Sequence, residues 1–234
     1  MPTQSRKMTP AVFVLNIIMT SLFFPALILL LAGDWRWVEG WLLAMWFVAM
    51  ILSNMIYLYL KDPALLAERT RKPGSGNQKT WDKFVGVIII VLALAWLVLM
   101  PLDARCFGWS PAFPVWLKIT GGILLLPALF LIYRATADNT FLSTVARIQS
   151  ERKQRVITGG VYGFVRHPLY LGCILLQVGA PLLVGSLAGI AISLVGIITL
   201  IVRIFGEEKM MLEELEGYRE YQKKVKYRLI PYVW

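Results

Sequence analysis

The chain has 234 residues, of which 58% are hydrophobic and 16% charged, with a mean hydropathy of +0.64 and a formal net charge of +10. Soluble domains are about half apolar and a quarter charged, so this composition excludes an ordinary soluble protein and favours an integral membrane protein. The positive charge does not indicate nucleic-acid binding, because the basic residues gather in loops between apolar segments rather than along one face.

Six apolar runs follow one another along the chain, at about 11–32, 38–60, 84–101, 113–133, 169–184 and 186–202. The first four are long enough, or nearly so, to cross a hydrocarbon core about 30 Å thick. The last two would each span only about 24 Å as helices, and only Gly185 and Ser186 separate them. We therefore expect about six membrane-embedded helices, of which the last two form a tight hairpin that does not necessarily cross the bilayer fully.

The lysines and arginines predict the orientation. Four segments hold 21 of the 24 basic residues: the N-terminus, the 61–83 loop, the 134–166 loop and the tail from 203 onward. Arg36, Arg105 and Lys118 remain for the other side. With six spans the four basic segments share one side, which the positive-inside rule assigns to the cytoplasm. Both termini are therefore predicted to be cytoplasmic.

The chain divides into two parts. Residues 1–110 are predicted to be accessory transmembrane helices, with a flexible turn at 72–77, whereas residues 111–234 carry nearly all the candidate chemistry. After the hairpin, apolar side chains recur at helical spacing, at Met211, Leu215, Tyr218, Tyr221, Val225 and Leu229. This pattern predicts an amphipathic helix, interrupted near Gly217, that lies on the cytoplasmic leaflet or closes one face over a site.

The only histidine, His167, lies between Arg166 and Pro168, where a basic loop meets an apolar run. A lone histidine is often structural. Pro168 suits the first turn of a helix, however, and the free backbone amides of such a turn can bind a carboxylate or phosphate. We expect His167 to contact a ligand rather than a metal. The sequence has no second histidine, and the spacing of Cys106 and Cys173 does not suit a metal site.

Two acidic residues follow the hairpin. Arg203 and Glu207 lie four residues apart and so on one helix face. Such an ion pair contributes little to stability when it is exposed to water. At the end of a membrane hairpin, however, it can be partly desolvated and directed at a ligand. Glu208 points about 100° away from Glu207, and beside Lys209 it is equally compatible with a solvated position.

Several motifs keep a fixed order over residues 139–234. They are Q-R-V-I-T-G-G-V-Y at 154–162, R-H-P-L-Y-L-G at 166–172, Arg203 followed by Glu207 and Glu208, and G-Y-x-x-Y at 217–221. Together they resemble the isoprenylcysteine carboxyl methyltransferase family and its phospholipid-methyltransferase relatives. The resemblance implies an integral membrane enzyme that takes a methyl group from S-adenosylmethionine.

The same resemblance implies site residues. The cofactor would be contacted by Gln154, Arg155, Val156, Ile157, Tyr162, His167, Pro168, Leu169, Tyr170, Glu207 and Glu208. Arg203 falls on the position that meets the methyl-accepting substrate, and we expect Arg203 and Glu207 to serve catalysis. The cofactor would enter from the cytoplasm, whereas a lipid-like tail would enter laterally from the membrane, the inner membrane if the source is bacterial.

The acceptor stays open at this point. The carboxylate of an isoprenoid or prenylcysteine-like molecule needs no base and could be oriented by Arg203 through a two-point contact. A phospholipid amine would require a glutamate to take a proton. A sterol-reductase-like enzyme and a non-catalytic membrane protein are further alternatives. The sequence does not predict an oligomeric state.

Overall fold

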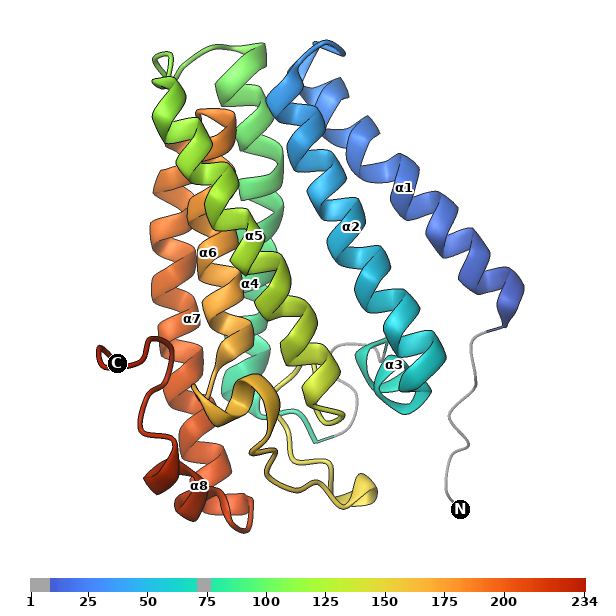
Figure 1. Ribbon diagram of the computed structural model, residues 1–234, viewed down its shortest axis with the longest axis vertical. Coiled ribbons are helices and arrows are strands. Elements are labelled where there is room, and N and C mark those ends of the chain that lie inside the picture. The colour runs from blue at the N-terminus through green and yellow to red at the C-terminus, as the bar shows by residue number, and fades with distance from the viewer. Residues whose placement is uncertain (1–8, 71–76) are drawn as a thin grey trace.

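The computed structural model describes residues 9–70 and 77–234, and every regular element within them is a helix (Figure 1). In chain order these are α1 (Pro10–Ala32), α2 (Val38–Lys61), α3 (Pro63–Arg69), α4 (Thr80–Pro101), η1 (Leu102–Cys106), α5 (Val115–Asp138), η2 (Ser150–Arg152), η3 (Gly160–Gly163), α6 (Pro168–Val184), α7 (Leu187–Glu214) and α8 (Tyr218–Lys224). The predicted all-helical class is confirmed. Of the turn expected at 72–77, all but Asn77 lies outside the described residues.

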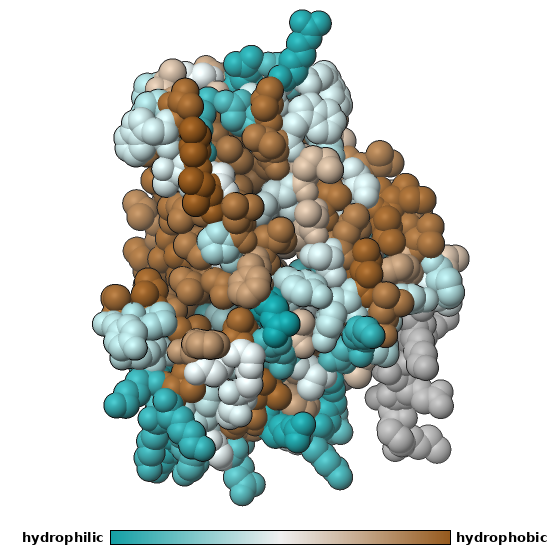
Figure 2. Space-filling model, viewed as in Figure 1, coloured by the Kyte–Doolittle hydropathy of each residue, from teal (hydrophilic) through white to brown (hydrophobic). Residues whose placement is uncertain are grey.

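Five helical segments are long and apolar enough to cross a membrane: α1, α2, α4 with η1, α5 and α7. α6 is shorter, with 17 residues, or about 25 Å of helical rise. Apolar side chains cover the middle of the face seen in Figure 2, and hydrophilic ones gather at its two ends. Side chains such as Leu22, Phe84 and Leu126 stay exposed along the helices. A surface of this kind suits hydrocarbon rather than water, as expected of an integral membrane protein.

α6 and α7 form a tight hairpin, as predicted. α6 ends at Val184, Gly185 adopts a left-handed φ of 79°, and the Ser186 side chain caps α7 by accepting from the backbone N–H of Gly189. A residue with a side chain would be strained at this φ, so glycine at 185 allows the immediate reversal.

The second arm of the hairpin is much longer than predicted. α7 runs for 28 residues, to Glu214, instead of ending near residue 202. The prediction was wrong because it equated the end of the apolar run with the end of the helix. Arg203, Glu207 and Glu208 remain helical, since each of these side chains finds a partner inside the protein.

Two glycines allow α5 and α6 to pack closely. A Cβ added at Gly121 would lie 2.4 Å from the backbone N of Leu183 and 2.5 Å from the carbonyl oxygen of Gly179. No side chain fits at that distance. Small residues at such crossings let the backbones of membrane helices approach and gain van der Waals contact. The α5–α6 pair therefore forms a firm base for the loop that joins the two helices.

Asp103 in η1 holds the turn of the hairpin at the opposite end of the bundle from α8 (Figure 1). Its carboxylate is 1% exposed. It accepts hydrogen bonds from Ser186 Oγ at 2.6 Å, from Ser110 Oγ at 2.7 Å and from the backbone N of Ala188 at 3.0 Å. A carboxylate at the first turn of a helix satisfies free amides and complements the helix dipole.

The C-terminal segment differs from the predicted amphipathic helix. Met211 belongs to α7, Gly217 reverses the chain with a φ of 81°, and α8 has only seven residues. Tyr218, Tyr221 and Val225 are buried against the end of α7 and the loop after α5, and Tyr218 and Tyr221 line a cavity there, so the segment adopts the second predicted arrangement, closing over a site, rather than lying on the leaflet. The helical spacing of these apolar side chains therefore reflects packing against the rest of the protein rather than against lipid. The interruption at Gly217 is as predicted.

The basic segments described by the structure lie at one end of the bundle. α3, the loop between α5 and α6 (residues 139–167, hereafter the α5–α6 loop) and α8 are neighbours at the lower end of Figure 1, where α1 also begins. The long helices thus alternate in direction in the way that the distribution of lysine and arginine predicts.

Candidate functional site

A polar cavity opens at this loop end, between the α5–α6 loop, the start of α6, the end of α7 and α8. It encloses about 850 Å³ of empty space, counting the open solvent at its mouth. Gln154 and Glu207 contribute polar groups to the wall, whereas Met211 and Leu215 contribute apolar surface. Such a wall suits a ligand that carries both charged and apolar parts.

The structure brings most of the predicted cofactor-binding residues together around this cavity. Ten of them line it: Gln154, Arg155, Val156, Ile157, Tyr162, His167, Pro168, Leu169, Tyr170 and Glu207. Glu208 does not line it. Arg203 also lies outside the lining, one helical turn before Glu207 on α7.

His167 and Pro168 begin α6 in the predicted manner. Pro168 occupies the first helical position and His167 the position before it. The imidazole is buried, and its Nε2 lies 3.3 Å from Glu208 Oε1. This contact fixes the ring at the cavity wall, beside the amides of the first turn of α6, where the helix dipole favours a negatively charged group.

Glu208 is buried rather than solvated. Only 3% of the residue is exposed. Its Oε1 accepts from Arg166 Nε at 2.7 Å, and its Oε2 accepts from Arg228 Nε at 2.8 Å. Glu208 therefore meets the cavity indirectly, through Arg166 and His167, which both line it. The sequence predicted that Glu208 touches the cofactor. In the structure its carboxylate points toward the two arginines and does not line the cavity.

The same cluster fastens the C-terminal segment to the start of α6. The backbone N–H groups of Arg166 and His167 donate to the carbonyl oxygens of Tyr227 and Arg228, at 3.0 and 2.9 Å. Arg166 Nη1 also donates to the carbonyl of Val225 at 2.7 Å. These bonds hold the two segments together without forming a helix or a strand pair. We call residues 225–229 the C-terminal strap.

Arg203, Glu207 and Tyr170 are joined across the hairpin. The Tyr170 hydroxyl donates to Glu207 Oε1 at 2.6 Å, and Arg203 Nε lies 3.3 Å from the same oxygen. Arg203 Nη2 donates to the carbonyl oxygen of Thr144, at 2.9 Å. The arginine side chain is 12% exposed, so it is largely desolvated, as the sequence predicted for a pair at this depth.

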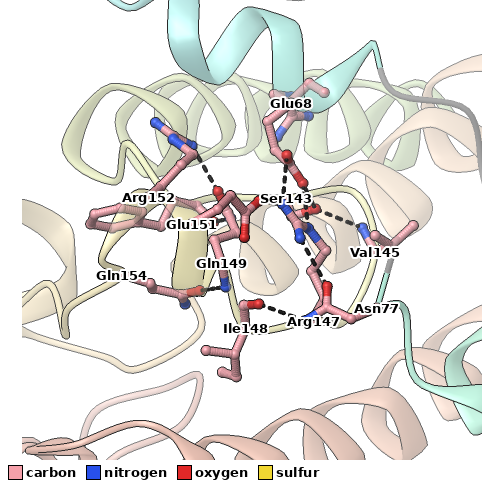
Figure 3. A network of polar contacts seen from close by, with 12 residues as sticks. Glu68, Asn77, Ser143, Val145, Arg147, Ile148, Gln149, Glu151, Arg152 and Gln154 are labelled. Carbon is pink, nitrogen blue, oxygen red and sulfur yellow. Dashed lines mark hydrogen bonds and ion pairs between the residues drawn. The ribbon is translucent and has the colours of Figure 1, made fainter. Parts of the chain in front are cut away.

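The α5–α6 loop is anchored to α3 by a buried ion pair (Figure 3). Arg147 donates from Nε to Glu68 Oε1 at 2.8 Å and from Nη2 to Glu68 Oε2 at 2.9 Å. Glu151 and Asn77 also bind this guanidinium. Burial alone would lower the pKa of Arg147, but hydrogen bonds to Glu68 and Glu151 outweigh it and raise the pKa. The planar two-point geometry is the strong form of such a pair.

Gln154 is held by the loop itself. Its Oε1 accepts from the backbone N of Gln149 at 2.7 Å, and Gln149 Nε2 donates to the carbonyl of Phe141 at 2.7 Å (Figure 3). Gln149 is fully buried, with 0% exposure. This internal bonding fixes the conformation of residues 141–154 without a helix or strand, so the loop presents a defined wall to the cavity.

Three buried tyrosines close the side of the cavity next to α8. Tyr162 donates from its hydroxyl to the carbonyl of Ala135 at 3.2 Å, and Tyr221 donates to the carbonyl of Tyr162 at 2.7 Å. Burial raises the pKa of Tyr162, Tyr218 and Tyr221 well above the ordinary value. All three are therefore neutral phenols near pH 7; they provide packing surface, and Tyr162 and Tyr221 also donate hydrogen bonds.

Several wall residues were not assigned by the sequence. They are Val145, Ala146, Arg147, Arg166, Met210, Met211, Leu215, Tyr218 and Tyr221, together with Asn139, Phe141, Leu142 and Ser143, which the sequence left without a role. The helical spacing after residue 210 was a signal for part of this set. No local signal indicates the residues that the loop contributes.

A second, apolar cavity lies deeper in the bundle, bounded by α2, α4, α6 and α7. Its wall includes Trp96, Cys173, Gln177, Gly196 and Leu200. Cys173 follows Tyr170 by one turn of α6, and Leu200 precedes Arg203 by one turn of α7. Along α6 the apolar cavity therefore begins about one helical turn beyond Tyr170 of the polar one, whereas along α7 Leu200 and Glu207 are about two turns apart.

Comparison with known proteins finds a matching family. Residues 116–213 match the model of the isoprenylcysteine carboxyl methyltransferase (ICMT) family. The matched part runs from α5 almost to the end of α7, so it includes the α5–α6 loop and the Arg203–Glu208 segment but not α8. No curated protein matches the chain.

Among solved structures, the chain is similar to the eukaryotic intramembrane Ras methyltransferase ICMT (isoprenylcysteine carboxyl methyltransferase), solved without a monobody. Sequence identity is 17%, the TM-score is 0.46, and the match covers 97% of this chain and 88% of the other.

Proposed function

We propose that the chain, whose residues 116–213 match the isoprenylcysteine carboxyl methyltransferase family, is a membrane enzyme that transfers a methyl group from S-adenosylmethionine to the carboxylate of a lipophilic acceptor. The observation that carries the proposal is the juxtaposition of the two cavities. The polar cavity reaches Tyr170 on α6 and Glu207 on α7, the apolar cavity reaches Cys173 and Leu200 on the same two helices, and Arg203 lies between Leu200 and Glu207 along α7.

The polar cavity fits the cofactor. Glu207 offers a carboxylate to its amino group, and the first turn of α6 beside His167 offers donors to its carboxylate. Tyr218 lines the cavity, and its buried hydroxyl has no hydrogen-bond partner among the residues that the structure describes. An unpaired buried hydroxyl is costly unless a ligand satisfies it.

The apolar cavity fits the tail of the acceptor. Its wall is almost entirely apolar side chains, with Gln177 as an exception. It spans α7 from Leu200 back to Ile192, eight residues or about 12 Å along the helix. A hydrocarbon chain held there would place its charged end beside Arg203. Each methylene buried contributes about 0.8 kcal/mol.

The chemistry requires little beyond alignment. When bound, S-adenosylmethionine supplies a methyl group on a positively charged sulfur. Arg203 orients the acceptor carboxylate so that one oxygen attacks the methyl carbon in line with the breaking carbon–sulfur bond. A carboxylate is already nucleophilic, so no residue has to remove a proton. Glu207, fixed by the Tyr170 hydroxyl, holds the cofactor in register.

A phospholipid amine is the second candidate acceptor. It would need a base, and Glu207 is the carboxylate at the cavity wall. Glu207 already accepts from Tyr170 and faces Arg203, so taking a proton would disrupt both contacts. This arrangement favours a carboxylate acceptor over an amine.

The site is proposed to face the cytoplasm. The basic loops lie at the same end of the bundle as the polar cavity, and basic loops are retained on the cytoplasmic side. The soluble methyl donor would then reach the cavity from the cytosol.

The test uses purified protein in detergent, S-adenosylmethionine labelled in its methyl group, and a total membrane lipid extract. We expect a labelled lipid whose label is released as methanol by mild base, because carboxyl methyl esters hydrolyse and N-methyl groups do not. Base-stable label would support the amine acceptor. No transfer to lipid, together with no binding of S-adenosylmethionine, would overturn the proposal.

A further inference from the structure

Asp82 lies in the first turn of α4, within the part of the chain that the sequence predicts to be accessory and outside the residues that the family model matches. Its side chain is fully buried, with 0% exposure. A buried carboxylate is costly unless it is paired. Its partners therefore indicate what it does.

The two carboxylate oxygens of Asp82 face different parts of the site. Oδ2 accepts from the backbone N of Ala146 at 2.7 Å and from Gln78 Nε2 at 2.9 Å. Oδ1 lies 3.0 Å from Arg203 Nε. Ala146 lines the polar cavity. One side chain thus ties the α5–α6 loop to the arginine proposed to hold the acceptor.

Arg203 touches the same loop a second time, through the bond from Nη2 to the carbonyl of Thr144 at 2.9 Å. A free arginine side chain has many rotamers, and orienting a substrate requires that this freedom be removed. Asp82 and Thr144 together restrict the guanidinium to one place relative to the loop that forms the cavity wall.

The position of Asp82 is itself fixed by packing. The neighbouring Trp81 ring lies on Gly206 of α7, where an added Cβ would come within 2.7 Å of the ring. Trp81 also packs against buried Ala146 and Met210. The first turn of α4 is therefore seated on both the loop and α7, so the carboxylate is a rigid reference point for Arg203.

We infer that Asp82 is a positioning residue for methyl transfer, holding Arg203 against the α5–α6 loop so that the acceptor carboxylate meets the methyl donor in line. The inference rests on the proposed function. It assigns to the N-terminal half a direct part in ordering the site.

A double-mutant cycle tests this inference, because residues that act through one another give non-additive losses. The variants are Asp82→Asn, Arg203→Lys and the double variant. In Asp82→Asn the amide oxygen still accepts from the backbone N of Ala146, but the charge facing Arg203 is lost. Methyl transfer is measured with labelled S-adenosylmethionine, using the membrane lipid extract and, separately, N-acetyl-S-farnesylcysteine as acceptors.

We expect Asp82→Asn to lower kcat/KM for the acceptor about ten- to a hundredfold, the range for losing a charged partner, while the Kd of S-adenosylmethionine changes less than about threefold. In the Arg203→Lys background, which lacks the Nε that faces Asp82, adding Asp82→Asn should cost less than about threefold more. If Asp82→Asn cannot be purified, Asp82→Glu, which keeps the charge but displaces it, takes its place in the cycle.

Asp103→Asn is the matched control, since Asp103 is also a buried carboxylate and lies at the other end of the same continuous helix. It should lower Tm without changing the acceptor kcat/KM of the folded fraction. The role of Asp82 would be overturned, and the proposed function would stand, if the two losses multiply in the double variant. An equal kinetic loss in Asp103→Asn would have the same meaning. A wild-type protein without methyl transfer would overturn the proposed function and this inference with it.

Discussion

The Tyr170 hydroxyl donates a 2.6 Å hydrogen bond to Glu207 Oε1 and so joins the first turn of α6 to the C-terminal half of α7. Both residues line the polar cavity. The bond fixes the carboxylate that we propose binds the amino group of the methyl donor.

Tyr170→Phe removes this donor and keeps the ring. We expect kcat/KM for S-adenosylmethionine to fall about ten- to a hundredfold, because a hydrogen bond to a charged group contributes roughly 1.5–3 kcal/mol. Steady-state kinetics at saturating acceptor measure the effect.

Tyr57→Phe is the control for that substitution. The Tyr57 hydroxyl donates to the carbonyl of Ala137 at 2.9 Å, and the residue does not line the polar cavity. It should cost about 1 kcal/mol of stability and leave kcat/KM unchanged. Equal kinetic losses in the two variants would contradict the role given to the Tyr170–Glu207 bond.

Glu208→Gln should loosen the C-terminal strap. Removing one charge from a buried group of ion pairs costs about 3–5 kcal/mol, because Arg166 would keep a buried charge, and Arg228 a partly buried one, without its partner. We expect a lower Tm and faster tryptic cleavage near Arg228, followed by mass spectrometry. S-Adenosylmethionine binding should weaken as well, since His167 loses its contact.

Glu213→Gln serves as the comparison, because Glu213 is exposed on the same helix. Its effect on stability should stay within about 0.5 kcal/mol. A Glu208 variant that resists trypsin as well as wild type would show that the strap is held by its backbone bonds alone.

Glu68→Gln should release the α5–α6 loop from α3. Only one oxygen would remain to accept from Arg147, whose charge is buried, with 2% of the side chain exposed. We expect faster hydrogen exchange at residues 143–154 and weaker binding of S-adenosylmethionine, whose proposed wall is this loop. Exchange followed by mass spectrometry measures the first, and calorimetry the second.

Glu39→Gln tests a pair of the same type away from the loop. Glu39 binds Lys118 at 2.6 Å, and a quarter to a third of each side chain is exposed. Partly exposed pairs contribute about 1 kcal/mol or less. Exchange in the α5–α6 loop should not change, and an increase there would mean that general destabilisation, rather than the Glu68 anchor, opens the loop.

The sequence predicts those parts of the fold that local signals control. Pro168 at a helix start, Gly185 at the hairpin turn and Gly217 after α7 each set the backbone where they stand, so each position was predicted correctly. Apolar run length likewise indicates how much chain suits a bilayer. It does not indicate where a helix ends, and α7 therefore extends beyond its prediction.

The anchors of the candidate site could not be predicted in this way. Asp82 binds Ala146 across 64 positions of sequence, and Glu68 binds Arg147 across 79. Nothing near Asp82 in the sequence distinguishes it from an acidic residue that merely favours the first turn of a helix. Only the packing of α4 on α7 shows that its carboxylate meets Arg203.

Gly196→Val should shorten the hydrocarbon chain that the enzyme accepts. An added Cβ at Gly196 would lie 2.1 Å from Gln177 Oε1, and both residues line the apolar cavity. The larger side chain has to displace Gln177 and reduce the space, so each methylene excluded from the cavity costs about 0.8 kcal/mol, or roughly fourfold in kcat/KM. Acceptors with geranyl, farnesyl and geranylgeranyl chains, compared in one assay, should show a loss that grows with chain length. Gly86→Val is the control, because nothing lies within 4 Å of an added Cβ there, and it should leave the ratios between chains as in wild type. An equal loss for all three chains in Gly196→Val would place the tail outside this cavity.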